Sequence, residues 1–163
     1  MARTGVGSCG RRRVGFTLVE ILIVVVILGI LAAIVTPQFA NATQEAQQGA
    51  FVSELKLFED AAYIYHAQTG LYPDDASSGE MPAAFEGLVR REQWESGTPI
   101  GGQWDAENDT FGFRSSVGVH FNSGPSQEPE FMELIDGTFD DGDLEAGVFR
   151  QIASDRYYLV VAF

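Results

Sequence analysis

The sequence predicts an α+β protein, in which a long amino-terminal helix packs on a small antiparallel β-sheet. Three observations predict this class: an apolar run over residues 16–36, an apolar stripe at helical spacing over 51–65, and strand-like runs near 111–121 and 156–163. A long helix followed by a group of strands is an α+β arrangement. The 163 residues allow one compact domain and one extra element.

Composition excludes several functions. The chain has 10 basic and 23 acidic residues, a formal net charge of −13. A protein that neutralises phosphates needs a basic face, so we expect no nucleic-acid partner. One cysteine and two histidines are too few for an internal disulfide or a structural zinc site. The motifs GxSxG, HExxH, GxxxxGK[ST] and CxxC are missing, and we predict that the protein is not an enzyme.

The first element is a polar, basic leader over residues 1–15. It holds four of the ten basic residues, the only cysteine and no acid. Arginines on the amino-terminal side of an apolar segment favour a cytoplasmic location for that end. We therefore expect the amino terminus in the cytoplasm and the carboxyl-terminal part exported.

The second element is the apolar run from Phe16 to Thr36, in which Glu20 is the only charged residue. As a helix it would be ~31 Å long, about the hydrocarbon thickness of a bilayer. Three other readings stay open: a secretory signal peptide cut at Ala40-Asn41-Ala42, a plain membrane anchor, and a buried core helix. The run exceeds the apolar region of about 7–15 residues in a signal peptide, and a plain anchor does not explain Glu20.

Glu20 needs a partner. A carboxylate at mid-membrane costs ~2.5–3.5 kcal/mol on insertion scales, and less near the interface. The apolar run contains no Lys or Arg. The partner could be the arginine cluster of the same chain or a positive group on another copy. Cleavage between Gly15 and Phe16 would create an α-amine four residues before Glu20, and either the same helix or a neighbouring subunit could supply it.

These residues resemble the amino-terminal signature of type IV pilins and type II secretion pseudopilins. Gly15 is followed by Phe-Thr-Leu-Val-Glu, then an aliphatic run closed by Pro37. The resemblance implies that a prepilin peptidase cuts after Gly15 and that the amine of Phe16 is methylated. It also implies polymerisation through the apolar helices, with Glu20 setting the register by pairing with the Phe16 amine of a neighbour.

The same resemblance implies a pilin-like α+β fold and divides the chain into four parts. We expect a prepilin leader (1–15), a transmembrane and fibre-core helix (16–36), the amphipathic half of the same helix (37–70) and a globular α+β head (71–163).

A second match concerns the turn Gly70-Leu71-Tyr72-Pro73, which resembles the turn after the long helix in major pseudopilins. It implies a structural subunit of a type II secretion pseudopilus or related pilus-like fibre. The protein would cross the inner membrane once, with its head on the periplasmic side. Its partners would be further copies of itself, the prepilin peptidase, the inner-membrane assembly platform and other pseudopilins. The alternatives are a type IV pilin for adhesion or motility, and a membrane-anchored or secreted ligand-binding module.

The remaining elements follow from local patterns. Pro37 lacks an amide hydrogen and is predicted to kink a helix that runs from Phe16 to Thr69, where Gly70 forms the cap. We expect short helices at Ala83–Arg91 and Pro129–Ile135 and a tight turn at 98–104. A half-buried strand is expected at 111–121. A carboxyl-terminal hairpin is expected to pair residues 148–152 with 156–163.

One metal site is a candidate. One acidic, glycine-containing segment offers the hard oxygen ligands that Ca²⁺ prefers, with carboxylates from Asp136, Asp140, Asp141, Asp143 and Glu145. Of these, Asp140, Asp141 and Asp143 are the predicted ligands. Their spacing is not that of an EF-hand, and an exposed acidic turn is the alternative. We expect no other cofactor. The two histidines, His66 and His120, are expected on the surface or in packing contacts.

Overall fold

The computed structural model describes residues 15–122 and 127–163, without the side chains of residues 40 and 41. The predicted leader therefore lies, except for Gly15, outside the described residues. The chain divides into two units, Met1–Ala42 and Thr43–Phe163. Helix α1, Leu18–Thr69, contributes residues to both, and its 52 residues confirm the long helix predicted from the sequence.

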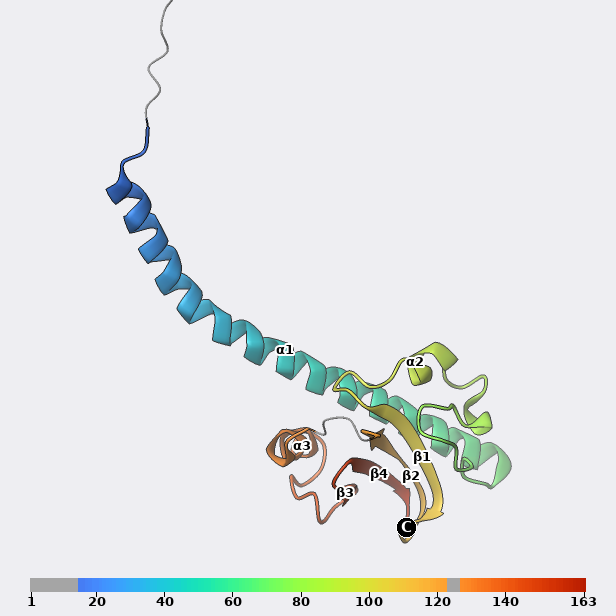
Figure 1. Cartoon of the computed structure of the whole chain (residues 1–163). Coiled ribbons are helices and arrows are strands. Elements are labelled where there is room, and N and C mark those ends of the chain that lie inside the picture. Colours follow the sequence, from blue (N-terminus) through green and yellow to red (C-terminus); the bar gives the residue numbers. More distant parts are fainter. Residues whose placement is uncertain (1–14, 123–126) are drawn as a thin grey trace, which may run out of the picture. The chain divides into compact units, whose positions relative to one another are not determined.

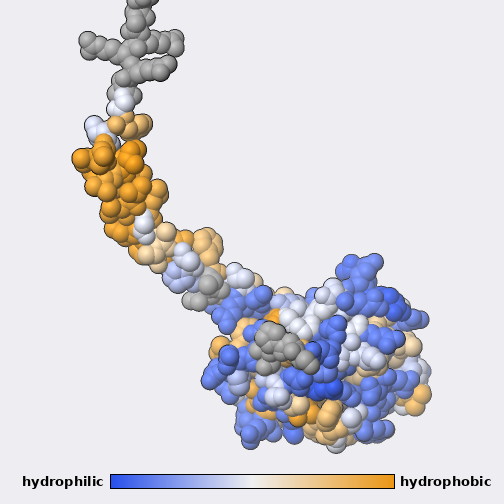
Figure 2. All heavy atoms as spheres, viewed as in Figure 1, coloured by the Kyte–Doolittle hydropathy of each residue, from blue (hydrophilic) through white to orange (hydrophobic). Residues whose placement is uncertain are grey.

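The amino-terminal unit contains the apolar part of α1. Large apolar side chains from Leu18 to Val35 are between 41% and 83% exposed, and their consecutive positions place them on all sides of the helix. Figure 2 shows this apolar surface from one side. Thr36 donates its hydroxyl to the carbonyl of Ala32 at 2.8 Å, so this polar side chain is satisfied within the helix. Pro37 lies inside α1, and the kink stays a prediction.

The carboxyl-terminal unit contains a four-stranded antiparallel sheet in the order β1-β2-β4-β3 (Figure 1). The strands are β1 Gln103–Thr110, β2 Phe113–His120, β3 Phe149–Ala153 and β4 Arg156–Ala162. Helix α3, Pro129–Asp136, precedes β3. The predicted hairpin of the last two strands and the helix at residue 129 are thus confirmed.

The core of this unit lies between the sheet and the carboxyl-terminal part of α1. Phe51, Leu55 and Phe58 recur at helical spacing and are fully buried. Trp104 of β1 stacks on Phe51 with ring centroids 5.2 Å apart and meets Phe58 edge-on at 4.8 Å. The apolar stripe of the sequence is therefore core packing. At the end of α1, Gly70 has φ 76° and donates its amide to the His66 carbonyl at 2.7 Å, as expected of a helix cap.

Three local predictions differ from the structure. Residues 83–91 do not form one helix: a 3₁₀ turn, η1 (Ala83–Phe85), is separated from the short helix α2 (Arg91–Glu95) because Gly87 adopts φ 82°. Strand β1 was not predicted. The strand expected over 111–121 is shorter, and from Ser115 to His120 it is buried on both faces rather than half-buried.

Candidate functional site

The first candidate site is the start of α1, where the carboxylate of Glu20 is held by Thr17. One oxygen of Glu20 accepts hydrogen bonds from the amide and from the hydroxyl of Thr17, both at 2.7 Å. In return, the amide of Glu20 donates to the Thr17 hydroxyl oxygen at 3.2 Å. This reciprocal pattern is a capping box, in which the side chains at the N-cap and third helical positions satisfy each other's amides.

Thr17 is therefore a site residue that the sequence prediction did not include. Its signal is present in the sequence, since Thr17-Leu-Val-Glu20 fits the S/T-x-x-E pattern before an apolar run. Two amides that would otherwise lack partners at the helix start are satisfied. The other oxygen of Glu20 takes no part in these bonds and is available to a donor from outside the helix.

The predicted cleavage position lies just before this cap. Gly15 and Phe16 precede the first helical residue, and both are exposed, Phe16 by 83%. No atom lies within 4 Å of a Cβ built on Gly15. The peptide bond between Gly15 and Phe16 is thus outside the helix and reachable.

The helix that follows is long and apolar enough to cross a membrane. Because it follows a prepilin-type amino terminus, the two features together suggest membrane anchoring. Glu20 is the only charged residue in the apolar run, and its carboxylate accepts the hydrogen bond from Thr17.

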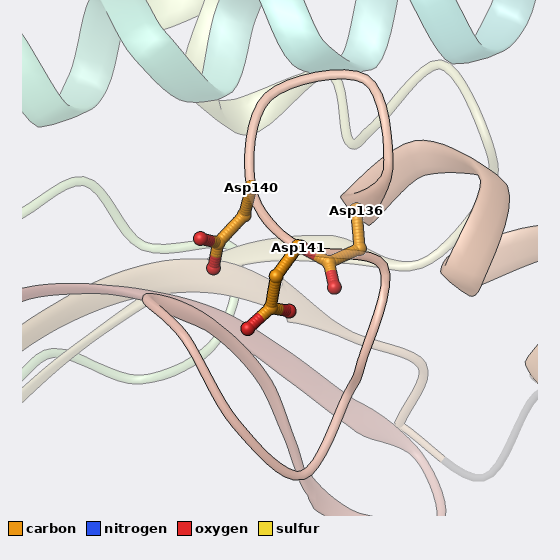
Figure 3. Close-up of side chains that lie close together, drawn as sticks. All are labelled: Asp136, Asp140 and Asp141. Atoms are coloured by element: carbon orange, nitrogen blue, oxygen red, sulfur yellow. The ribbon is translucent and has the colours of Figure 1, made fainter.

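The second candidate site is an acidic cluster of Asp136, Asp140 and Asp141 (Figure 3). Asp136 is the last residue of α3, and the other two lie on the loop that follows. One carboxylate oxygen from each residue lies within 4.8 Å of the others. Within the described part of the chain, none of the three carboxylates forms an ion pair with Lys or Arg.

Asp136 is the unusual member of the cluster. Its side chain is fully buried, and neither carboxylate oxygen has a partner at hydrogen-bonding geometry. Burial, and then the charges of Asp140 and Asp141, raise the pKa of Asp136 to about 6, although the amides of Gly142 and Asp143 act in the opposite direction. A buried carboxylate without a partner is costly, so a cation at this position would satisfy it.

The loop holds the other two carboxylates in place. Asp140 accepts hydrogen bonds from the amides of Val148 and Phe149, the second at 3.0 Å, and so ties the loop to β3. A Cβ at Gly147 would come within 2.1 Å of the Asp140 carboxylate, which explains the glycine there. Asp141 accepts the amide of Asp143 at 2.9 Å.

The structure thus brings together two of the three predicted ligands and replaces the third. Asp143 lies outside the cluster, and its carboxylate accepts the amide of Glu145 at 3.0 Å. Asp136 takes its place. Asp136 was part of the acidic segment identified in the sequence but was not chosen as a ligand. Helical spacing favours it, since it follows Met132 by four residues and shares its buried face.

The comparison with family models agrees with the geometry of the amino-terminal site. Residues 11–36 match the prokaryotic N-terminal methylation motif, which covers Gly15, Phe16 and Glu20. The amino-terminal segment therefore has the features of the prepilin class of proteins.

Curated relatives narrow this class. The chain is 41% identical over 63 residues to the type II secretion system core protein G of Aeromonas hydrophila, covering 39% of this chain and 44% of the relative. It is 40% identical over 63 residues to the protein of that name from Vibrio cholerae, covering 39% and 43%. For Pseudomonas aeruginosa the values are 33% over 97 residues, covering 60% and 62%. The motif and these matches support the pseudopilin family for this chain.

The extent of the matches is limited. The chain spans less than two thirds of the length of each of these relatives. No solved structure matches the chain. The family model covers residues 11–36, and the role of the whole protein is a proposal.

Proposed function

We propose that this protein is a structural, non-catalytic subunit of a type II secretion pseudopilus or a related pilus-like fibre. The observation that carries the proposal is one ionisable side chain, Glu20, held at the start of an apolar helix that directly follows an exposed Gly15-Phe16 bond. A carboxylate in that position is costly in a lipid environment unless it has a role there.

The proposed assembly has two steps. A prepilin peptidase cleaves after Gly15 and the new amine of Phe16 is methylated, which leaves a cation at the helix start. Subunits then pass from the inner membrane into a fibre in which that amine meets Glu20 of a neighbour. In the single chain, Thr17 keeps Glu20 satisfied until the neighbour arrives. The pair sets the register, because an unpaired charge in the helix bundle would cost several kcal/mol.

The charge distribution supports a fibre held by its helices. After the proposed cleavage, the chain keeps six basic and 23 acidic residues. Heads of this charge repel one another at low salt. Figure 2 shows the contrast between the apolar part of α1 and the hydrophilic surface of the head. Packing of the apolar helices against one another then provides the attraction between subunits.

The proposal includes a single-pass topology, with the amino terminus in the cytoplasm and the head on the periplasmic side. The arginines at positions 11–13 support this orientation. The proposed partners are further copies of the chain, other pseudopilins, the prepilin peptidase and the inner-membrane assembly platform.

Intact mass spectrometry of the protein from membranes tests the proposal. We expect a chain that begins at Phe16 and is heavier by one methyl group. Cleavage after Ala42 would instead indicate a secreted, soluble protein and contradict the proposal. Electron microscopy of the same cells separates the two fibre types, since a pseudopilin gives short periplasmic fibres and an adhesive pilin gives long surface fibres.

We further propose that the acidic cluster binds Ca²⁺. Asp136, Asp140 and Asp141 would supply the carboxylate ligands, and Ca²⁺ takes six to eight oxygens in flexible geometry. The support comes from Asp136, a buried carboxylate with no partner at hydrogen-bonding geometry. The bound cation would join the end of α3 to the loop that leads into β3.

A further inference from the structure

At the end of the sheet where β2 begins and β4 ends, the head holds an arginine between two aromatic rings. The guanidinium carbon of Arg150 lies 5.7 Å from the ring centre of Phe113 and 5.4 Å from that of Phe163. The two rings meet edge-on, with their centres 5.8 Å apart. Nε of Arg150 donates to the Gly147 carbonyl at 2.8 Å. These contacts hold the guanidinium in place, and its terminal nitrogens still have hydrogens to donate.

Arg114 provides a second cation at the same end of the sheet. It follows Phe113 in β2, and its guanidinium carbon lies 5.8 Å from the ring centre of Tyr72. Arg91 and Arg156 form ion pairs with carboxylates of their own chain. Over the residues that the structure describes, neither Arg114 nor Arg150 does so. Both cations are therefore available to carboxylates from outside the head.

Exposed apolar side chains accompany these two arginines. Phe163 and Leu71 are each 64% exposed. Leu71 lines a cavity of about 160 Å³ together with Tyr72 and Arg114. We call this surface the arginine end of the head, defined by Leu71, Arg114, Arg150 and Phe163. It combines positive charge with apolar surface on a head in which acidic residues far outnumber basic ones.

The outer face of α3 has the complementary composition. Glu130, Glu133 and Leu134 are exposed, Leu134 by 63%, while the inner face of the helix is buried in the core. Residues three and four apart lie on the same side of a helix, so these three side chains form one surface. In the described part of the chain, neither glutamate has an ion pair. This face therefore offers two carboxylates and one apolar side chain.

The two surfaces lie at different levels of the head. Beside α3, the side-chain amide of Gln48 donates to the Phe131 carbonyl at 3.4 Å. Near the end of β4, the Tyr63 hydroxyl donates to the Val161 carbonyl at 3.2 Å. These two residues of α1 are fifteen positions apart, which corresponds to ~22 Å along the helix. Figure 1 likewise shows α3 well apart from the C label at the end of β4. One head can therefore use both surfaces at once.

We propose that the outer face of α3 in one copy docks on the arginine end of the next copy in the fibre. This inference rests on the proposed function. Two carboxylates meet two guanidinium groups, and Leu134 meets the exposed ring of Phe163. Charge pairs of this kind attract heads whose net charges repel one another, and they favour one register of contact. Because the two surfaces differ, the contact is heterologous and repeats from copy to copy without closing a dimer.

Disulfide cross-linking tests which surfaces meet. The proposed cleavage after Gly15 removes Cys9, the only cysteine, so introduced cysteines are the only thiols of the mature chain. When sheared fibres are oxidised, we expect the Leu134→Cys, Phe163→Cys variant to give a ladder of linked subunits. The matched control is Glu92→Cys, Phe163→Cys, since Glu92 is an exposed residue of α2. The control should give no ladder.

The outcomes separate this inference from the proposed function. Normal fibres without a ladder, or an equal ladder in the control, would overturn the docking of α3 on the arginine end. In that case the arginine end serves another partner or none, and the fibre proposal stands. If the unmodified chain forms no fibres, both proposals are contradicted.

Charge reversal gives an independent readout. In the Arg114→Glu, Arg150→Glu variant, like charges would face each other, and we expect about fivefold less subunit in sheared fibres relative to membranes. The Glu130→Arg, Glu133→Arg variant should show a similar loss. Combining all four substitutions restores opposite charges and should recover the fibres. Thermal unfolding checks that each head is folded. A folded combined variant that assembles no better than either parent would overturn the proposal.

Discussion

Replacing Glu20 by alanine is expected to abolish fibre assembly while leaving membrane insertion intact. The substitution removes the one charged group from the apolar run, so insertion becomes easier by up to ~2.5–3.5 kcal/mol. It also leaves the Phe16 amine of each neighbour without a counter-ion inside the helix bundle. An unpaired buried charge costs about 3–5 kcal/mol when its partner is removed, and this cost recurs at every subunit of the fibre.

The measurement compares the amount of subunit in membranes with the amount in sheared fibres, for cells that produce each variant. Glu45→Ala is the matched control, because Glu45 is an exposed carboxylate of α1 outside the apolar run. We expect the control to assemble normally. The Glu20→Ala chain should be processed, accumulate in membranes and be missing from fibres. Normal fibres from Glu20→Ala would show that the carboxylate does not set the register.

The capping box adds a second expectation to the same experiment. Glu20→Gln keeps an oxygen that can accept from Thr17, so the helix start is preserved while the negative charge is lost. If charge pairing controls assembly, Glu20→Gln should fail as Glu20→Ala does. If the helix cap alone matters, Glu20→Gln should assemble. The two variants therefore separate a role in helix capping from a role in subunit register.

The sequence was sufficient for the elements whose patterns are strong. The long helix follows from an apolar run and a stripe at helical spacing, and β4 follows from consecutive β-branched and aromatic residues. Strand β1 was missed because its residues include Asp, Glu and Asn, which are rare in strands. Its alternation was visible, with Trp104 and Ala106 facing the core. The partners that allow Asp105 and Glu107 to be buried come from β4, about fifty residues later in the chain.

The two candidate sites also differ in how well the sequence alone predicts them. Gly15, Phe16 and Glu20 form a local motif that is read directly from neighbouring residues. The proposed cation site is different, because an acidic loop is visible in the sequence while the burial of Asp136 results from the packing of α3 in the core. Asp143 was included because it is close in sequence, although its carboxylate caps the amide of Glu145. Ligand choice within such a loop depends on tertiary packing.

Replacing Asp136 by asparagine is expected to stabilise the calcium-free head at pH 7 and to remove its response to calcium. The folded-state pKa of Asp136 is about 6, above the 3.8 of an unperturbed aspartate. The folded state therefore holds its proton more tightly, and the resulting stability is present below pH 3.8 and lost as the pH rises through about 6. The loss at pH 7 is on the order of 2–3 kcal/mol for this buried group, and the neutral amide avoids it.

Without calcium the Asp136→Asn variant is expected to be more stable than the unmodified head, and calcium should reverse this order. The cation binds the ionised carboxylates of the folded state only. The free energy of unfolding of the unmodified head therefore rises with the logarithm of the calcium concentration. This gain becomes smaller below pH 6, because Asp136 takes up a proton there. We expect a Tm rise of about 5 °C in excess calcium for the unmodified chain and for Asp143→Asn, the matched control, but none for Asp136→Asn. An equal rise in all three proteins would place any bound calcium elsewhere. If the calcium-dependent rise in Tm were lost in Asp143→Asn and kept in Asp136→Asn, the ligands would be Asp140, Asp141 and Asp143, as predicted from the sequence. Because Asp136 belongs to α3 and Asp140 ties the loop to β3, a cation held between them links two elements of the head by a contact that requires calcium and near-neutral pH.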